Sequence, residues 1–180
     1  MTKYFIEVGS CDFDTLNHLA DYGWKGIIIE PVKKFLDNIP RKEGIEYVNV
    51  AIDLQDGKRK IHVWPDNITS QPQYRDYRGM SGFNNLPENI DICYELEVDC
   101  LCINSLLKKY PVPRIDLLKI DTEGHDFKVL HQFPLSGPLR PKLIKVETQH
   151  HNIEVFNNYF KDKSYQIFYE KNDIYAIDLL

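Results

Sequence analysis

Short apolar runs that alternate with helical segments constrain the fold of this chain more than any other feature of its sequence. The first third holds three runs with the character of buried strands, at Tyr4–Val8, Gly26–Glu30 and Tyr47–Ile52. Between them, apolar residues recur at helical spacing in the segments 14–23 and 31–38. Strands that are apolar on both faces are typical of parallel sheets, and a β-α-β-α-β order implies right-handed crossovers. The sequence therefore predicts a doubly wound α/β fold with a mostly parallel sheet.

The last third of the chain continues this alternation. Its predicted elements are a strand at Ile115–Asp121, a helix at 123–132, a strand at Leu143–Glu147, a helix at 153–160 and strands at 165–169 and 174–177. Only a short polar turn separates the last two strands, and this spacing predicts an antiparallel hairpin at the C-terminal end of the sheet.

The middle of the chain has a different character. Short strands are predicted at 60–64 and 94–101, and a short helix follows before Pro111. The segment 65–92 is rich in Asn, Pro, Gln, Tyr and Arg and shows no steady period. A stretch of this kind inside a compact domain is usually functional or disordered, and we predict a lid or substrate loop. The 180 residues fit one domain, 1–180.

Composition and charge exclude several classes of protein. The formal net charge is -5 with both signs interspersed, which leaves no electrostatic footprint for non-specific nucleic-acid binding. No apolar run approaches the roughly 20 residues that a membrane helix needs, and no secretory signal is recognisable. The four cysteines match neither a zinc ribbon nor a redox pair, so we interpret them as reduced thiols of a cytoplasmic protein.

Small and acidic residues follow the ends of the first three predicted strands. In open α/β sheets, ligands bind outside the carboxyl ends of the strands, where the strand order reverses. Gly9 permits a tight turn close to a ligand, and the helix amides after it can hold an anionic group. Glu30 has the position of a carboxylate that accepts both hydroxyls of a ribose, and Asp53 that of a partner for a base amino group. On these residues alone, ordinary turns and a surface carboxylate remain alternatives.

The segment 121–126 is the densest polar cluster of the sequence. Asp121 directly follows a predicted buried strand, where a donor group and an acceptor would meet. As alternatives, Glu123 and Asp126 only occupy the favourable first turn of a helix, and His125 is a solvated helix residue.

A second polar cluster, 147–151, is predicted to reach the same edge of the sheet. It contains the paired histidines His150 and His151. Because an unperturbed imidazole titrates near neutral pH, His150 is a candidate general base. The alternative is that both histidines belong to an ordinary loop.

Five blocks of the sequence resemble the FkbM-type methyltransferase family. They are Phe5–Gly9, Ile29–Pro31, Asn49–Ile52, Ile115–Gly124 and Pro141–Glu147, in the order in which the family has them. The most specific block contains Leu-Lys-Ile-Asp-Thr-Glu-Gly. The resemblance implies a class I methyltransferase fold of seven strands with the last one antiparallel. It also implies S-adenosyl-L-methionine as cofactor and O-methylation of hydroxyls on sugars and natural products.

The resemblance also implies roles for individual residues. Carried over by position, the methionine part of the cofactor is lined by Glu7, Gly9 and Ser10, the ribose is bound by Glu30, and the transfer site is flanked by Asp121 and Glu123. In this cofactor, the base amino group that Asp53 would meet is that of adenine. The proton of the acceptor hydroxyl is expected to pass to His150 or Asp121.

Two features depart from the family pattern. Phe13 stands where the family often has a second glycine, so the loop after the first strand must take a different path. The chain also starts directly on that strand, without the helices that often cap the substrate site. Contacts to a small-molecule or glycan acceptor are then expected from the 65–92 loop, from the two histidines, or from the partner in a homodimer. Within the loop, the first residues to test are Ser81, Asn84 and Asn85.

Other functions are consistent with the same residues. The chain is alternatively a non-catalytic module that keeps the fold and the cofactor, or a metal-assisted hydrolase with Asp121, Glu123, Asp126 and His150 around a divalent ion. A dinucleotide-binding protein is disfavoured because the first turn lacks the G-x-G-x-x-G spacing.

Overall fold

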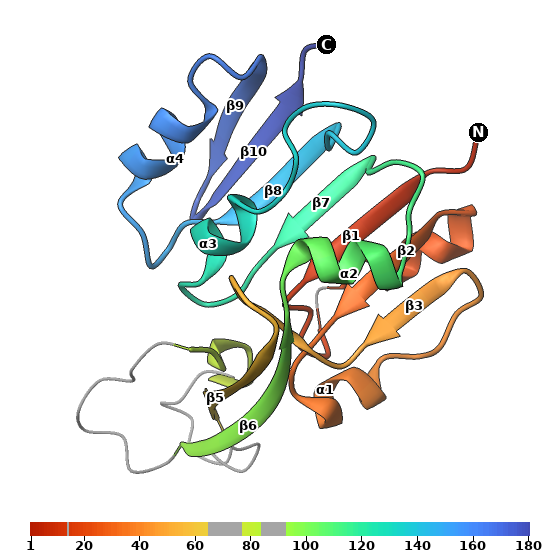
Figure 1. Cartoon of the computed structure of the whole chain (residues 1–180), viewed down its shortest axis with the longest axis vertical. Coiled ribbons are helices and arrows are strands. Elements are labelled where there is room, and N and C mark those ends of the chain that lie inside the picture. Colours follow the sequence, from red (N-terminus) through yellow and green to blue (C-terminus); the bar gives the residue numbers. More distant parts are fainter. Residues whose placement is uncertain (14, 65–76, 84–92) are drawn as a thin grey trace.

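The computed structural model describes residues 1–13, 15–64, 77–83 and 93–180. Its main sheet has seven strands in the order β3-β2-β1-β7-β8-β10-β9 (Figure 1). They are β1 (Tyr4–Val8), β2 (Lys25–Ile29), β3 (Ile45–Val48), β7 (Leu117–Ile120), β8 (Leu143–Glu147), β9 (Tyr165–Glu170) and β10 (Asp173–Asp178). β10 pairs antiparallel with β8 and with β9, and the other pairs are parallel. The predicted α/β class, the mostly parallel sheet and the antiparallel C-terminal strand are confirmed.

Both faces of the sheet centre are covered, as the unbroken apolar runs predict. On β1, Phe5 and Ile6 point to opposite faces, and both are fully buried. Ile6 packs with residues of α2 (Ile103–Lys109), α3 (Asp126–Leu130) and α4 (Ile153–Phe160). Phe5 belongs to a separate cluster on the other face. In Figure 1, α2 and α3 lie in front of the sheet.

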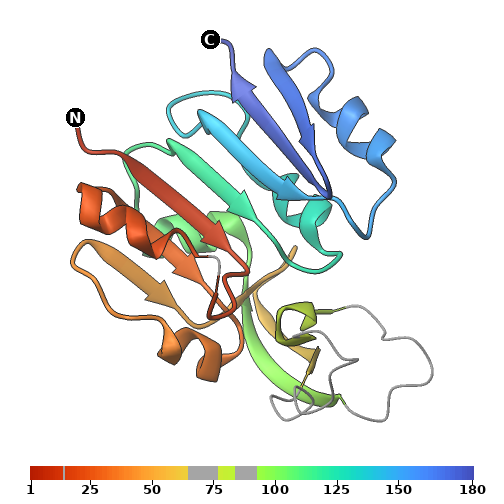
Figure 2. The ribbon, with the colours of Figure 1, turned by 180° about the vertical axis from the view of Figure 1, so that it is seen from behind.

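The opposite face is covered by η1 (Leu16–Tyr22) and by part of α1 (Lys33–Asn38), and Figure 2 shows η1 in front. The predicted helix at 14–23 is a 3-10 helix that begins after Thr15, whose hydroxyl accepts from the amide of Asn17 at 3.3 Å. Gly23, at φ +79°, ends it. No helix of the described residues is long and apolar enough to cross a membrane.

The predicted third strand, Tyr47–Ile52, is wrong as a single element. β3 ends at Val48, and Ala51–Ile52 forms β4 in a second sheet with β5 (Gly57–Val63) and β6 (Tyr94–Leu101), in the order β4-β6-β5. The reason is a tertiary contact: the Asn49 side-chain amide donates to the carbonyls of Glu30 at 2.9 Å and Pro31 at 2.8 Å. These bonds tie the chain to the end of β2 and turn it away from the main sheet.

The predicted lid or substrate loop at 65–92 falls mostly outside the described residues. Its described part, 77–83, contains the short helix η3 (Tyr77–Met80), and Gly82 pairs with His62 of β5. This part lies beside the carboxyl ends of β1, β2 and β7, where it helps to form a cavity.

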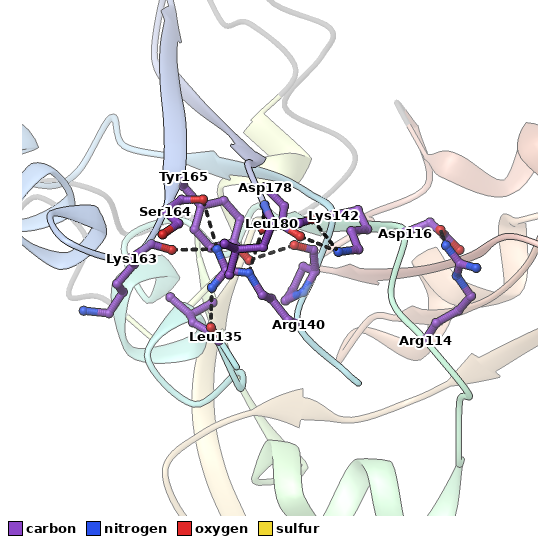
Figure 3. Close-up of polar contacts among 11 residues, drawn as sticks. Arg114, Asp116, Leu135, Arg140, Lys142, Lys163, Ser164, Tyr165, Asp178 and Leu180 are labelled. Carbon is purple, nitrogen blue, oxygen red and sulfur yellow. Dashed lines mark hydrogen bonds and ion pairs between the residues drawn. The ribbon is translucent and has the colours of Figure 1, made fainter. Parts of the chain in front are cut away.

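A buried arginine fixes the C-terminal strand at the opposite end of the sheet (Figure 3). The Arg140 guanidinium donates to the carboxylate of Asp178 at 2.7 Å and to the carbonyls of Lys163 at 2.6 Å and Ser164 at 3.1 Å. The guanidinium carbon of Arg140, Cζ, also lies 4.1 Å from the ring centroid of Tyr165. β9 and β10 are therefore anchored to the connection that enters β8.

Candidate active site

A cavity of about 270 Å³ lies where the strand order reverses between β1 and β7. One wall comes from the turns after β1 and β2, and another from the ends of β7 and β8. The second sheet and the segment 79–83 contribute apolar side chains, among them Ile52, Ile61, Met80 and Phe83. The cavity thus joins a largely apolar part to a part that is rich in carboxylates.

The turn after β1 depends on a glycine. Gly9 has φ +79°, and a Cβ added there would lie 1.8 Å from the carbonyl oxygen of Asp121. Only a residue without a side chain lets the β1 turn lie directly against the end of β7. Gly9 and the buried Ser10, which the resemblance assigns to the cofactor, both line the cavity.

Glu30 also lies in the cavity wall, immediately after β2. Its carboxylate accepts hydrogen bonds from the amides of Cys11 and Val32, each at 2.8 Å. Burial raises the pKa of Glu30 to about 7, against the opposing effect of these two amides. Because each carboxylate oxygen has two lone pairs, these amide bonds leave acceptor capacity for ligand hydroxyls.

Two residues assigned to the cofactor from sequence lie outside the cavity lining. Glu7 is fully buried and receives bonds from Lys119 at 3.1 Å, the Thr15 hydroxyl at 2.6 Å and the Leu16 amide at 2.8 Å. Its contact with a cofactor would be indirect, through Lys119, which does line the cavity.

Asp53 is the second of these residues. Its carboxylate lies 3.0 Å from Arg59 Nε and 3.1 Å from His125 Nε2. Burial raises the pKa of Asp53, but the Leu54 amide and His125 outweigh this effect and hold it below the usual value. Asp53 therefore joins the second sheet to the start of α3.

The alternative that His125 is a solvated helix residue is wrong. Its side chain is buried, and its ring centroid lies 4.6 Å from that of Phe83. Burial lowers the pKa of His125 and favours the neutral imidazole. Periodicity could not reveal this position, because Asp53 and Phe83 come from distant parts of the chain.

Three carboxylates meet at the other end of the cavity: Asp121, Glu123 and Glu147. Burial raises the pKa of Asp121 to about 6. Burial, with a smaller contribution from the charges of Asp121 and Glu123, raises the pKa of Glu147 to about 9. The Oε2 atom of Glu147 is buried and accepts no hydrogen bond from a described residue. Glu147 was not singled out from sequence, although it ends a predicted strand beside the histidines.

The paired histidines contact different carboxylates. His150 Nε2 lies 2.9 Å from Glu123 Oε2; Glu123 lines the cavity, whereas His150 lies outside the lining. His151 Nε2 lies 3.2 Å from Asp126 Oδ2. Asp126 is fully buried and also accepts from the amides of Thr122 at 2.6 Å and Gly124 at 2.9 Å. Glu123 therefore belongs to the cavity wall and His150 contacts it from outside the lining, whereas Asp126 shapes the loop that enters α3.

A metal ion would find a different set of ligands from the one considered in the sequence. Among the residues that the structure describes, Glu123, Glu147 and His150 each place a ligand atom within 4.8 Å of the others. Neither Asp121 nor Asp126 belongs to this group, and Glu147 is added to it. Carboxylates and imidazole together suit divalent transition metals.

Phe13 and Ser81 complete the wall on the side of the second sheet. A Cβ added to Gly79 would lie 2.8 Å from the Phe13 ring, so the aromatic side chain packs closely over η3. The Ser81 hydroxyl accepts from the Trp64 amide at 3.2 Å. Asn84 and Asn85 lie outside the described residues.

Comparison with protein families matches residues 7–168 to the methyltransferase FkbM domain. No curated protein and no solved structure shows significant similarity to the chain.

Proposed function

The chain belongs to the FkbM methyltransferase domain family, and from that premise we propose that it transfers the methyl group of S-adenosyl-L-methionine to a hydroxyl of a sugar or another small molecule. The observation that carries the proposal is the cavity at the strand reversal, which has Glu30 in one wall and Asp121, Glu123 and Glu147 in another. Family membership supports the methyltransferase activity, and the lining chemistry supports the cofactor.

The lining residues fit each part of this cofactor. The apolar side chains Phe35, Val50, Ile52 and Ile61 offer a surface for an adenine ring. Glu30 is placed to accept the ribose hydroxyls, and the glycine turn lets the backbone approach the methionine part. When bound, the cofactor supplies a methyl group on a positively charged sulfur. The ionised carboxylates at the far end would stabilise such a positive charge in a partly buried site.

The acceptor hydroxyl must lose its proton during methyl transfer, and we assign that proton to His150. Its Nε2 is oriented by Glu123, which leaves Nδ1 as the atom that receives the proton. Asp121 is the alternative acceptor, because burial raises its pKa to about 6 and so makes its carboxylate more basic. Asp121 lines the carboxylate-rich end, where the acceptor and the methyl group would meet, and His150 contacts Glu123 of the same end.

The acidic character of this end favours a neutral acceptor, such as a small hydroxylated molecule or a glycan, over a phosphate-rich one. Any further acceptor contacts would come from the 65–92 loop or from a second subunit of a homodimer. The four cysteines, all among the described residues, form no disulfide, and we propose a cytoplasmic location, in which thiols stay reduced.

Calorimetry with S-adenosylhomocysteine and transfer of labelled methyl groups to hydroxylated acceptors test the proposal. Binding together with transfer is the expected result. Absence of binding contradicts the proposal, and binding without transfer to any acceptor favours the non-catalytic module instead.

Metal-assisted hydrolysis is a second candidate, favoured only by the grouping of Glu123, Glu147 and His150. It predicts that Mn²⁺ raises the melting temperature and that Glu147→Gln removes this effect. An unchanged melting temperature with Mn²⁺ would leave methyl transfer as the better explanation of the site.

A further inference from the structure

Lys119 is a buried cation at the wall of a cavity that is otherwise acidic. The described acidic and basic residues that line the cavity are Glu30, Asp121, Glu123, Glu147 and Lys119. Lys119 lies on β7, is 3% exposed, and takes no part in the proton transfer described above. A buried ammonium needs compensating partners, and its place in a cavity wall lets a ligand be one of them.

The position of the Lys119 ammonium is fixed by the fold. β1 and β7 pair in parallel with Glu7 beside Lys119, and Nζ lies 3.1 Å from Glu7 Oε1. The other oxygen of Glu7 accepts from the Thr15 hydroxyl and the Leu16 amide at the start of η1. Glu7 is thereby held in one orientation, and it holds the ammonium at the cavity wall.

Stability alone is a weak explanation of this ion pair. Replacing a buried ion pair with apolar residues of similar volume is often neutral or stabilising, because desolvation offsets the Coulombic attraction. A lysine ammonium has three N–H donors, so it can serve Glu7 and a ligand at the same time. It also lies 4.0 Å from Asp121 Oδ2, which places opposite charges side by side at the wall.

We propose that Lys119 binds the carboxylate of the methionine part of the cofactor, while Asp121 and Glu147 face its ammonium. The inference rests on the proposed function. The amino-acid end of the cofactor is a zwitterion, and the cavity wall has the complementary pattern: one cation beside a group of carboxylates. Lys119, on β7, would then supply an anion contact in addition to the loop after β1, where Phe13 stands in place of a family glycine.

The test compares S-adenosylhomocysteine with its decarboxylated analogue, which keeps the adenosine, the thioether and the amine. Calorimetry on the wild-type protein is expected to show about tenfold to 100-fold weaker binding of the analogue, the range of a hydrogen bond to a charged group. The Lys119→Met variant is expected to bind both ligands with similar affinity, because the group that distinguishes them is gone.

Two further variants separate binding from folding. Glu7→Gln/Lys119→Met leaves no uncompensated buried charge and is expected to behave as Lys119→Met does. Lys145→Met changes the lysine next to Lys119 on β8, which pairs with Asp173 at 3.1 Å outside the cavity lining, and should keep the wild-type preference.

The results distinguish the two proposals. Equal binding of both ligands by the wild-type protein overturns the role of Lys119, as does a variant that still prefers the carboxylate ligand. If the wild-type protein binds neither ligand, the proposed function fails first, and the role of Lys119 fails with it.

Discussion

The carboxylate of Glu30 accepts a hydrogen bond from the backbone amide of Cys11 at 2.8 Å, which links the turn after β2 to the turn after β1. The same carboxylate lies in the cavity wall. One residue thus links both turns and lies where the proposed ribose would bind. Changes at Glu30 should therefore affect ligand binding more than changes at other acidic residues.

Replacing Glu30 with Gln is expected to weaken S-adenosylhomocysteine binding about tenfold to 100-fold, because a charged acceptor for the ribose hydroxyls is lost. Calorimetry at pH 8 measures this effect. Glu46→Gln, at an exposed position of β3, is the matched control and should bind as the wild-type protein does. Unchanged affinity of Glu30→Gln would remove Glu30 from the site.

Binding should also depend on pH through Glu30. Because burial raises the pKa of this group to about 7, it is largely protonated at pH 6 and largely ionised at pH 8. Ribose hydroxyls donate more strongly to the ionised form, so the affinity is expected to rise over this range. A titration series on Glu30→Gln should show a clearly smaller rise, with the remainder due to Asp121, whose pKa is about 6. An equal pH dependence in the variant would assign the whole effect to another group.

Gly9 and Gly23 form a matched pair, since both have φ +79°. A side chain at Gly23 meets nothing within 4 Å, so Gly23→Ala should cost only the left-handed strain of about 1–2 kcal/mol. Gly9→Ala adds a clash with the Asp121 backbone and should lower the urea midpoint further and weaken ligand binding. Equal midpoints for the two variants would contradict the close approach of the β1 turn to β7.

Replacing His150 with Ala is expected to lower the methyl-transfer rate about 100-fold or more, the range for a general base, and to leave cofactor affinity intact. Rate measurements at saturating cofactor test it. The exposed His18→Ala variant controls for loss of an imidazole elsewhere and should keep full activity. A fully active His150→Ala enzyme would leave Asp121 as the proton acceptor.

Protonation of Asp178 should lower the free energy of unfolding at acid pH. Burial raises the pKa of Asp178, but hydrogen bonds from Lys142 and Arg140 outweigh it and lower the pKa to about 2. Because the pKa of Asp178 is lower in the folded protein than its ordinary value of 3.8, the ionised carboxylate stabilises the fold above pH 3.8. This stabilisation is lost as the pH falls toward 2.

Asp178→Asn leaves the buried Arg140 without its charged partner, so it should destabilise the protein by about 3 kcal/mol at pH 7. The difference from the wild-type protein should shrink below pH 4. Urea unfolding across this range measures it, with the exposed Asp37→Asn as control. A difference that stays constant with pH would show that the ion pair contributes little.

The sequence alone predicted the strand ends at which the candidate site lies. Gly9, Glu30 and Asp121 each follow an apolar run, and the end of such a run can be recognised without the partner strand. The bend after β3 could not be recognised in this way. The sequence from Val48 to Ala51 has the pattern of one apolar strand. The hydrogen bonds from Asn49 that divide it have their acceptors at the end of β2, which is distant in the sequence.

What the sequence by itself determined is the order of buried strands and the small or acidic residues that end them, because periodicity and turn chemistry are local properties. The tertiary structure alone decided which side chains meet. Glu7 and Lys119 are far apart in the chain, and the register of β1 against β7 brings them together. The contacts between His150 and Glu123 and between His125 and Asp53 likewise exist only in the folded arrangement. Such contacts depend on strand register and side-chain direction, which no local pattern encodes.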